Sequence, residues 1–61
     1  MSDKRRKDLE DQLNDYYKNL RELEQIKLFI TNDPIERQRV SRAIQQTKEG
    51  IQKVEQELQN L

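Results

Sequence analysis

The sequence contains no cysteine and no histidine, and these two absences exclude several kinds of chemistry at once. Without cysteine the chain forms no disulfide, and without either residue type it has no ligand set of the kind that zinc prefers. A nucleophile–base pair built on Cys or His is excluded as well. The single glycine cannot make a glycine-rich phosphate loop. We therefore expect no enzyme, no metal site and no bound cofactor.

Long apolar runs are also missing. No stretch approaches the roughly 20 apolar residues that a transmembrane helix needs. The first residues, MSDKRRK, are not followed by the apolar segment of a secretory signal. The basic run 4–7 could contact phosphate or lipid, but we favour a solvated helix end. We expect a cytoplasmic protein without a role at the membrane.

The chain has no surplus of charge of either sign, since 12 Lys and Arg residues balance 12 Asp and Glu residues. Nucleic-acid binding depends on a surplus of Lys and Arg, so we do not expect a nucleic acid as the main partner. Charged residues make up 39% of the chain and hydrophobic residues 31%, values found in disordered chains and in coiled coils. The spacing of the apolar residues distinguishes these two classes.

Apolar residues recur at alternating intervals of four and three on both sides of residues 31–37. This heptad spacing is typical of helices that pack along one seam. Before residue 31 the seam has one gap, at Lys27, which we expect Ile26 to fill. The predicted hairpin core consists of Leu9, Leu13, Tyr16, Leu20, Leu23 and Ile30 in the first helix and Val40, Ile44, Ile51, Val54 and Leu58 in the second.

Residues 31–37, Thr-Asn-Asp-Pro-Ile-Glu-Arg, interrupt the helical pattern. Asp33 has the features of a helix N-cap, with Pro34 at the first helical position and Glu36 at the capping-box spacing. Asn32 suits a left-handed end of the first helix. Because Pro34 disfavours the helical conformation at Asp33, a single helix kinked at this point is the less favoured alternative.

The predicted fold is therefore all-α. It is one domain over residues 1–61, an antiparallel two-helix hairpin of the coiled-coil type that assembles into a four-helix bundle or a higher oligomer. We expect helix one over about residues 4–31, the turn at 32–34 and helix two over about 34–61. Matching the two seams places facing residues where their numbers add to about 70, for example Ile26 with Ile44 and Leu9 with Leu61.

Two residues of the second helix depart from the apolar seam. Thr47 lies at a seam position, where its hydroxyl can donate to the carbonyl of Ala43. Gly50 is in mid-helix, where glycine costs about 1 kcal/mol relative to alanine. Gly50 either makes room for a tyrosine ring or another helix, or it is a tolerated imperfection on a solvated face.

Apolar residues remain that the seam does not use. Leu28, Phe29 and Ile35 are large, and exposing them together would leave an apolar patch on the hairpin. They either cap the hairpin as a small satellite core or contact a partner, and we favour the partner. The predicted partner surface consists of Tyr17, Leu28, Phe29, Ile35 and Ala43.

The stretch Leu20–Glu49, with the turn NDPIERQR between two polar heptad helices, resembles small helical-hairpin domains of bacteria, especially of multidomain cyanobacterial proteins. In those proteins they look like effector-associated adaptor domains beside signalling NTPases, proteases or TIR modules. The resemblance implies homotypic or heterotypic association that brings effectors together, and it implies no catalytic residue. The layout is also similar to the plasmid-encoded Rop protein, by architecture alone.

We expect the chain to be an interaction module that self-associates or recruits another helical domain. The alternative is a small dimeric RNA-binding regulator of Rop-like architecture, which would use the basic run 4–7 or Arg37, Arg39 and Arg42. Intrachain pairing is the favoured role for these three arginines. A membrane-surface role is weaker, because neither helix has a continuous basic face opposite bulky apolar residues.

Overall fold

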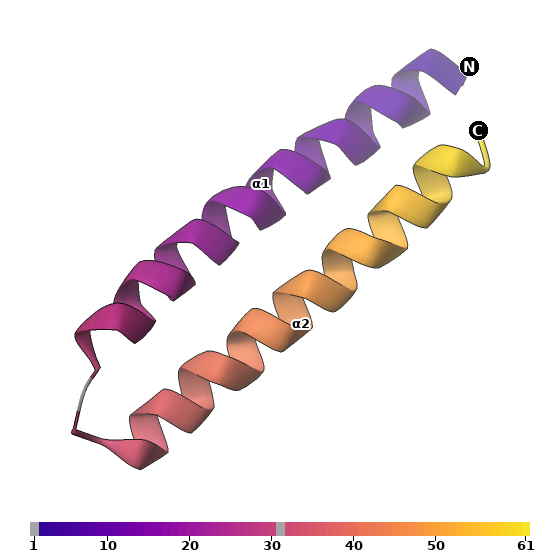
Figure 1. Ribbon diagram of the computed structural model, residues 1–61. Coiled ribbons are helices and arrows are strands. Elements are labelled where there is room, and N and C mark those ends of the chain that lie inside the picture. Colours follow the sequence, from indigo (N-terminus) through magenta and orange to yellow (C-terminus); the bar gives the residue numbers. More distant parts are fainter. Residues whose placement is uncertain (1, 31) are drawn as a thin grey trace.

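The computed structural model describes residues 2–30 and 32–61 and consists there of two α-helices that run antiparallel (Figure 1). Helix α1 spans Ser2–Phe29 and helix α2 spans Pro34–Gln59. Both chain ends lie at the end of the hairpin opposite the turn. The molecule measures 50 × 15 × 10 Å, so it is one layer of two helices. The predicted all-α hairpin is confirmed, and the single kinked helix is excluded.

Helix α1 ends at Phe29, about two residues before the predicted end. The last turn tightens, because the Ile30 N–H donates to the Lys27 carbonyl at 3.3 Å, a spacing of three residues. A β-branched residue such as Ile30 also favours leaving the helix. Asn32 lies outside α1, in the segment that joins the two helices. Thr31, the predicted last residue of this helix, lies outside the described residues.

Helix α2 begins as predicted. Asp33 is extended, with φ −118° and ψ 101°, and its Oδ1 accepts the N–H groups of Ile35 at 3.0 Å and Glu36 at 3.3 Å. Pro34 occupies the first turn, where its missing N–H leaves nothing unsatisfied. The Glu36 carboxylate lies 3.5 Å from the Arg39 guanidinium. Asp33 is therefore the side chain that caps this helix.

Replacing Asp33 with alanine is expected to lower the free energy of unfolding by about 1 kcal/mol, because two N–H groups lose their acceptor. Urea unfolding followed by circular dichroism measures this loss. Asp33→Ser keeps a capping oxygen at the same position and is expected to stay within about 0.5 kcal/mol of the parent chain. Equal losses in the two variants would contradict the capping role.

The core is a single seam between the helices. It buries Leu9, Val40, Ile44, Ile51 and Val54, and Leu9 is only 1% exposed. Thr47 is buried in the same seam, and its Oγ1 donates to the Ala43 carbonyl at 2.8 Å, as predicted. The other predicted core residues are half-buried: Leu13, Tyr16, Leu20, Leu23, Ile30 and Leu58.

The pairing of the helices differs from the prediction by one heptad. Arg5 contacts Glu57 at 2.6 Å, and the Tyr16 ring lies against Gly50, so facing residue numbers add to 62 and 66 instead of about 70. The predicted layer of Leu9 with Leu61 is therefore wrong, and Leu61 is 46% exposed. The midpoint of the hairpin must lie in the turn, near residue 32, whereas the predicted pairing puts it inside α2.

Candidate interaction surface

The described residues offer no enclosed site. Within residues 2–30 and 32–61 no three acidic, His or Cys side chains come together as metal ligands. Across the same residues, neither helix combines the length and apolar content needed to cross a bilayer. The hollows on the surface are open grooves along the helices. The large exposed apolar side chains of this part of the chain lie on the outer surface of the hairpin.

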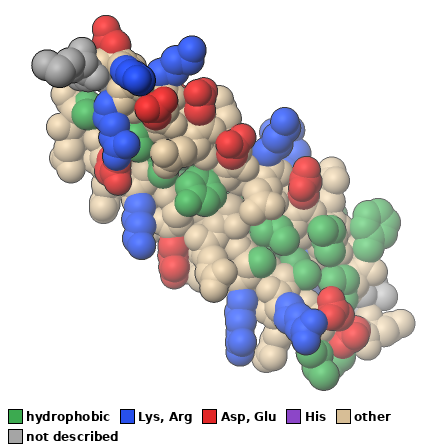
Figure 2. All heavy atoms as spheres, turned by 180° about the vertical axis from the view of Figure 1, so that it is seen from behind, with side chains coloured by type: hydrophobic (Ala, Val, Ile, Leu, Met, Phe, Trp, Pro, Cys, Tyr) green, Lys and Arg blue, Asp and Glu red, His purple; other side chains and the backbone are tan. Residues whose placement is uncertain are grey.

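The largest exposed apolar side chains flank the turn. Phe29 is 86% exposed, Leu28 79% and Ile35 66%. Leu28 and Phe29 end α1, and Ile35 lies in the first turn of α2. Hydrophobic side chains gather towards the turn end in the space-filling view (Figure 2). We call Leu28, Phe29 and Ile35 the turn-end patch. Because these side chains are exposed, they do not form the satellite core considered as an alternative.

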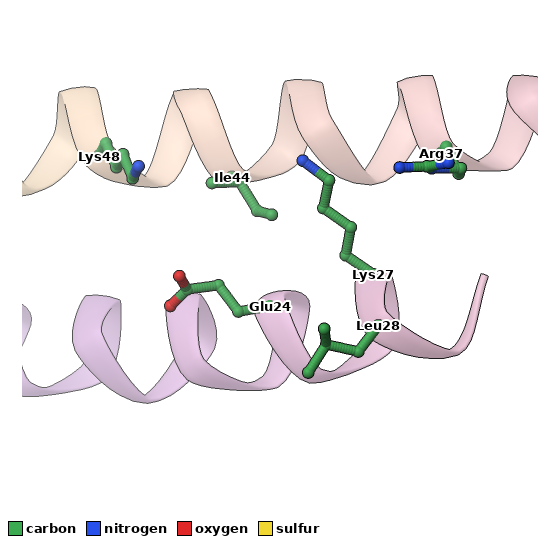
Figure 3. Close-up of a pocket in the computed structure, with 6 residues that line it drawn as sticks. All are labelled: Glu24, Lys27, Leu28, Arg37, Ile44 and Lys48. Atoms are coloured by element: carbon green, nitrogen blue, oxygen red, sulfur yellow. The ribbon is translucent and has the colours of Figure 1, made fainter. Parts of the chain in front are cut away.

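The gap in the first seam is not filled as predicted. Ile26 is 48% exposed, so it does not pack into the seam beside Ile44. Figure 3 shows the Lys27 side chain reaching from α1 towards α2, next to Ile44. The seam position therefore keeps its lysine, with an exposed amine and an aliphatic stem along the groove. Ile26 is left as further exposed apolar surface.

A groove of about 410 Å³ runs between the helices beside the turn-end patch. Leu28 and Ile44 supply its apolar lining (Figure 3). Its charged lining consists of Glu24, Lys27, Arg37 and Lys48. Three cations and one carboxylate give this groove a positive excess. The turn end therefore combines exposed apolar side chains with a basic groove.

The predicted partner residues do not form one continuous surface. Tyr17 is 45% exposed, but it precedes Phe29 by twelve residues, or about 18 Å along the helix. Ala43 is half-buried and has only a methyl group to offer. Only Leu28, Phe29 and Ile35 lie together, around the turn. The sequence pattern did not predict that Ile26 is exposed, because Ile26 was expected to fill the seam gap at Lys27.

Gly50 makes room for a tyrosine ring, the first of its two predicted roles. A Cβ added at Gly50 would lie 2.7 Å from Cζ and 2.8 Å from Cε1 of Tyr16. Real Cβ atoms essentially never approach so closely. The ring of Tyr16 therefore packs on the bare backbone of α2, and Gly50 lets the helices accept this large side chain.

The basic residues considered for RNA binding are partly engaged within the chain. The Arg5 guanidinium pairs with Glu57 on the other helix, and Arg39 with Glu36 one turn earlier. Both pairs are exposed, with each side chain about half or more accessible, so they contribute little to stability. The glutamates in these pairs nevertheless neutralise two arginines that would otherwise be free to contact the phosphates of RNA.

Comparison with protein families, curated proteins and solved structures gives no match to this chain. The resemblance to bacterial effector-associated hairpins therefore stays a prediction from the turn sequence NDPIERQR and its flanking helices.

Proposed function

We propose that this chain is a protein–protein interaction module that self-associates by helix packing, as two hairpins in a four-helix bundle. One observation carries the proposal: the hairpin is a single layer whose most exposed large apolar side chains, the turn-end patch, are 66% to 86% exposed. A seam between two helices uses one stripe of each. A second apolar surface is what a bundle requires.

The size of the chain supports the same conclusion. A chain of 61 residues buries a small share of its surface and is marginally stable without a disulfide, a metal or a partner. Burying a large apolar side chain contributes about 1.5–3 kcal/mol. Burying the three side chains of the turn-end patch would therefore contribute about 4.5–9 kcal/mol per copy, which is of the same order as the roughly 4–15 kcal/mol that association costs. An adaptor that recruits another helical domain would use the same patch.

Substituting Leu28→Asp together with Phe29→Asp is expected to weaken self-association at least about hundredfold, because two exposed apolar anchors become charged. Light scattering over a range of protein concentrations measures the mass. The parent chain is expected to show a dimer or a larger assembly.

The matched control is Gln12→Asp together with Asn19→Asp, which introduces two carboxylates at exposed positions of α1 outside the patch, on the side of the helix opposite Tyr17 and Leu28. This variant is expected to associate within about threefold of the parent chain. A parent chain that remains a monomer at all concentrations would overturn self-association. If the variant with Leu28→Asp and Phe29→Asp associated as strongly as the parent chain, the turn-end patch would not be the surface through which the chain self-associates.

A further inference from the structure

Although the net charge of the chain is zero, charges of opposite sign are clustered in two neighbouring bands in the middle of the hairpin. Residues 9–15 with 49–55 contain five carboxylates and one lysine, an excess of four negative charges. Residues 16–22 with 42–48 contain four basic side chains and one glutamate, an excess of three positive charges. We call them the acidic band and the basic band. All eleven of these charged side chains are exposed.

Each band crosses both helices. The contacts of Arg5 with Glu57 and of Tyr16 with Gly50 place facing residues where their numbers add to 62 and 66. Residues 9–15 of α1 therefore lie level with 49–55 of α2, and 16–22 lie level with 42–48. The bands are adjacent, and their boundary falls at the middle of the hairpin, since α1 spans Ser2–Phe29 and α2 spans Pro34–Gln59.

The area of one face limits how two copies can pair. The backbone of the hairpin is 50 Å long and 15 Å wide, so the flat outline of one broad face, without its side chains, is about 750 Å². Stable interfaces bury about 800 Å² on each partner. Contact between the turn ends alone would cover only a part of this face. A stable pair therefore needs contact that extends from the turn end along the sides of the two hairpins.

We propose that the partner surface is completed by a second copy of this chain lying antiparallel, with a twofold axis at the boundary between the bands. This inference rests on the proposed self-association. In the antiparallel pair each acidic band lies on the basic band of the other copy, twice by symmetry. In a parallel pair each acidic band would lie on the acidic band of the other copy, and each basic band on the other basic band, so like charges would repel. The remaining segments, 3–8 with 56–61 and 23–41, carry excesses of one positive charge and of zero, so they decide little.

The exposed apolar side chains fit the antiparallel pair. Tyr17 lies on α1 at the boundary between the bands, so two copies of this ring come near the twofold axis. The turn-end patch of one hairpin lies at the end of the other where Leu61 is 46% exposed. The proposal rests on the charges, which favour the antiparallel orientation over the parallel one.

Single cysteines test the orientation, because the chain has none of its own. Tyr17→Cys, or its exposed neighbour Lys18→Cys, is expected to give most of the protein as a covalent dimer with a short bismaleimide. Asn32→Cys is expected to give less than about a tenth of that yield, because the two turns lie on the order of 40 Å apart in the antiparallel pair. Linking is measured by denaturing electrophoresis at a concentration where light scattering shows the dimer.

The outcomes separate the two proposals. Efficient linking through Asn32→Cys in a protein that is dimeric by light scattering overturns the antiparallel pair and leaves self-association standing. A monomer in light scattering overturns both. A dimer that links at residue 17 or 18 and not at residue 32 supports the antiparallel pair.

A charge reversal tests the bands themselves. Arg42→Glu with Lys48→Glu turns the basic band negative and is expected to raise the dimer dissociation constant at least about tenfold at low salt. High salt is expected to reduce this difference, because 1 M salt shortens the screening length to about 3 Å. Lys4→Glu with Lys7→Glu makes the same net change outside the bands and is expected to shift the constant less than about threefold. Equal effects of the two variants would overturn the role of the bands.

Discussion

Replacing Leu9 with alanine is expected to lower the free energy of unfolding by about 3 kcal/mol. Leu9 is 1% exposed and lies where the open end of the hairpin is held together, one turn after the Arg5 side chain that pairs with Glu57. The substitution loses the burial of the side chain and leaves a cavity that two rigid helices cannot close. Urea unfolding at one fixed protein concentration measures the loss, since association would add to stability.

Leu61→Ala is the matched control, because the predicted pairing placed Leu61 opposite Leu9. Leu61 is 46% exposed, so the same truncation is expected to cost less than about 1 kcal/mol. Should Leu9→Ala unfold the chain entirely, Leu9→Val removes one methylene and is expected to cost about 1 kcal/mol. Similar losses at residues 9 and 61 would favour the pairing predicted from the sequence over the one in the structure.

The pairing was mispredicted because a heptad pattern matches itself after a shift of seven residues. With facing numbers that add to about 70, nearly every apolar residue of one seam still meets an apolar residue of the other. The turn removes this ambiguity. Helix α1 ends at Phe29 and α2 begins at Pro34, so the midpoint lies near residue 32 and the layers follow from it. Leu9 then belongs beside Val54 rather than Leu61, and both Leu9 and Val54 are buried.

Local features were predictable where they depend on neighbours in the sequence. The cap by Asp33 needs only the following two N–H groups, and the Thr47 hydroxyl needs only the carbonyl of Ala43 one turn before it. Helical geometry places these partners without help from the rest of the fold. The hairpin itself follows from Pro34 between two apolar seams.

The exposure of the side chains near the turn could not be predicted from the spacing of apolar residues in the sequence. Whether Phe29 and Ile35 fold over the turn or remain exposed depends on the path of the residues that connect the helices. The pattern allowed both, and the structure leaves the two side chains 86% and 66% exposed. Ile26 was misplaced because a heptad count favours an apolar neighbour at the gap left by Lys27.

Gly50 offers the sharpest test of how the two helices fit. Alanine in place of a mid-helix glycine ordinarily stabilises by about 1 kcal/mol. Here the added Cβ would meet Cζ of Tyr16 at 2.7 Å and Oη at 3.0 Å. Overpacking of this kind costs about 1–3 kcal/mol, because the ring or the helix has to move. The tyrosine is half-buried and lies on the seam, so its displacement also disturbs the core.

We therefore expect Gly50→Ala to lower the free energy of unfolding by about 1 kcal/mol in the parent chain, against its helix propensity. In a Tyr16→Leu background the clash is gone and the seam remains apolar, so the same substitution is expected to stabilise by about 1 kcal/mol. Urea unfolding of the parent, the two single variants and the double variant gives a coupling of about 2 kcal/mol. If Gly50→Ala stabilised both backgrounds equally, the ring of Tyr16 would not be held against Gly50. The reversal of sign is what a direct contact between these two residues requires.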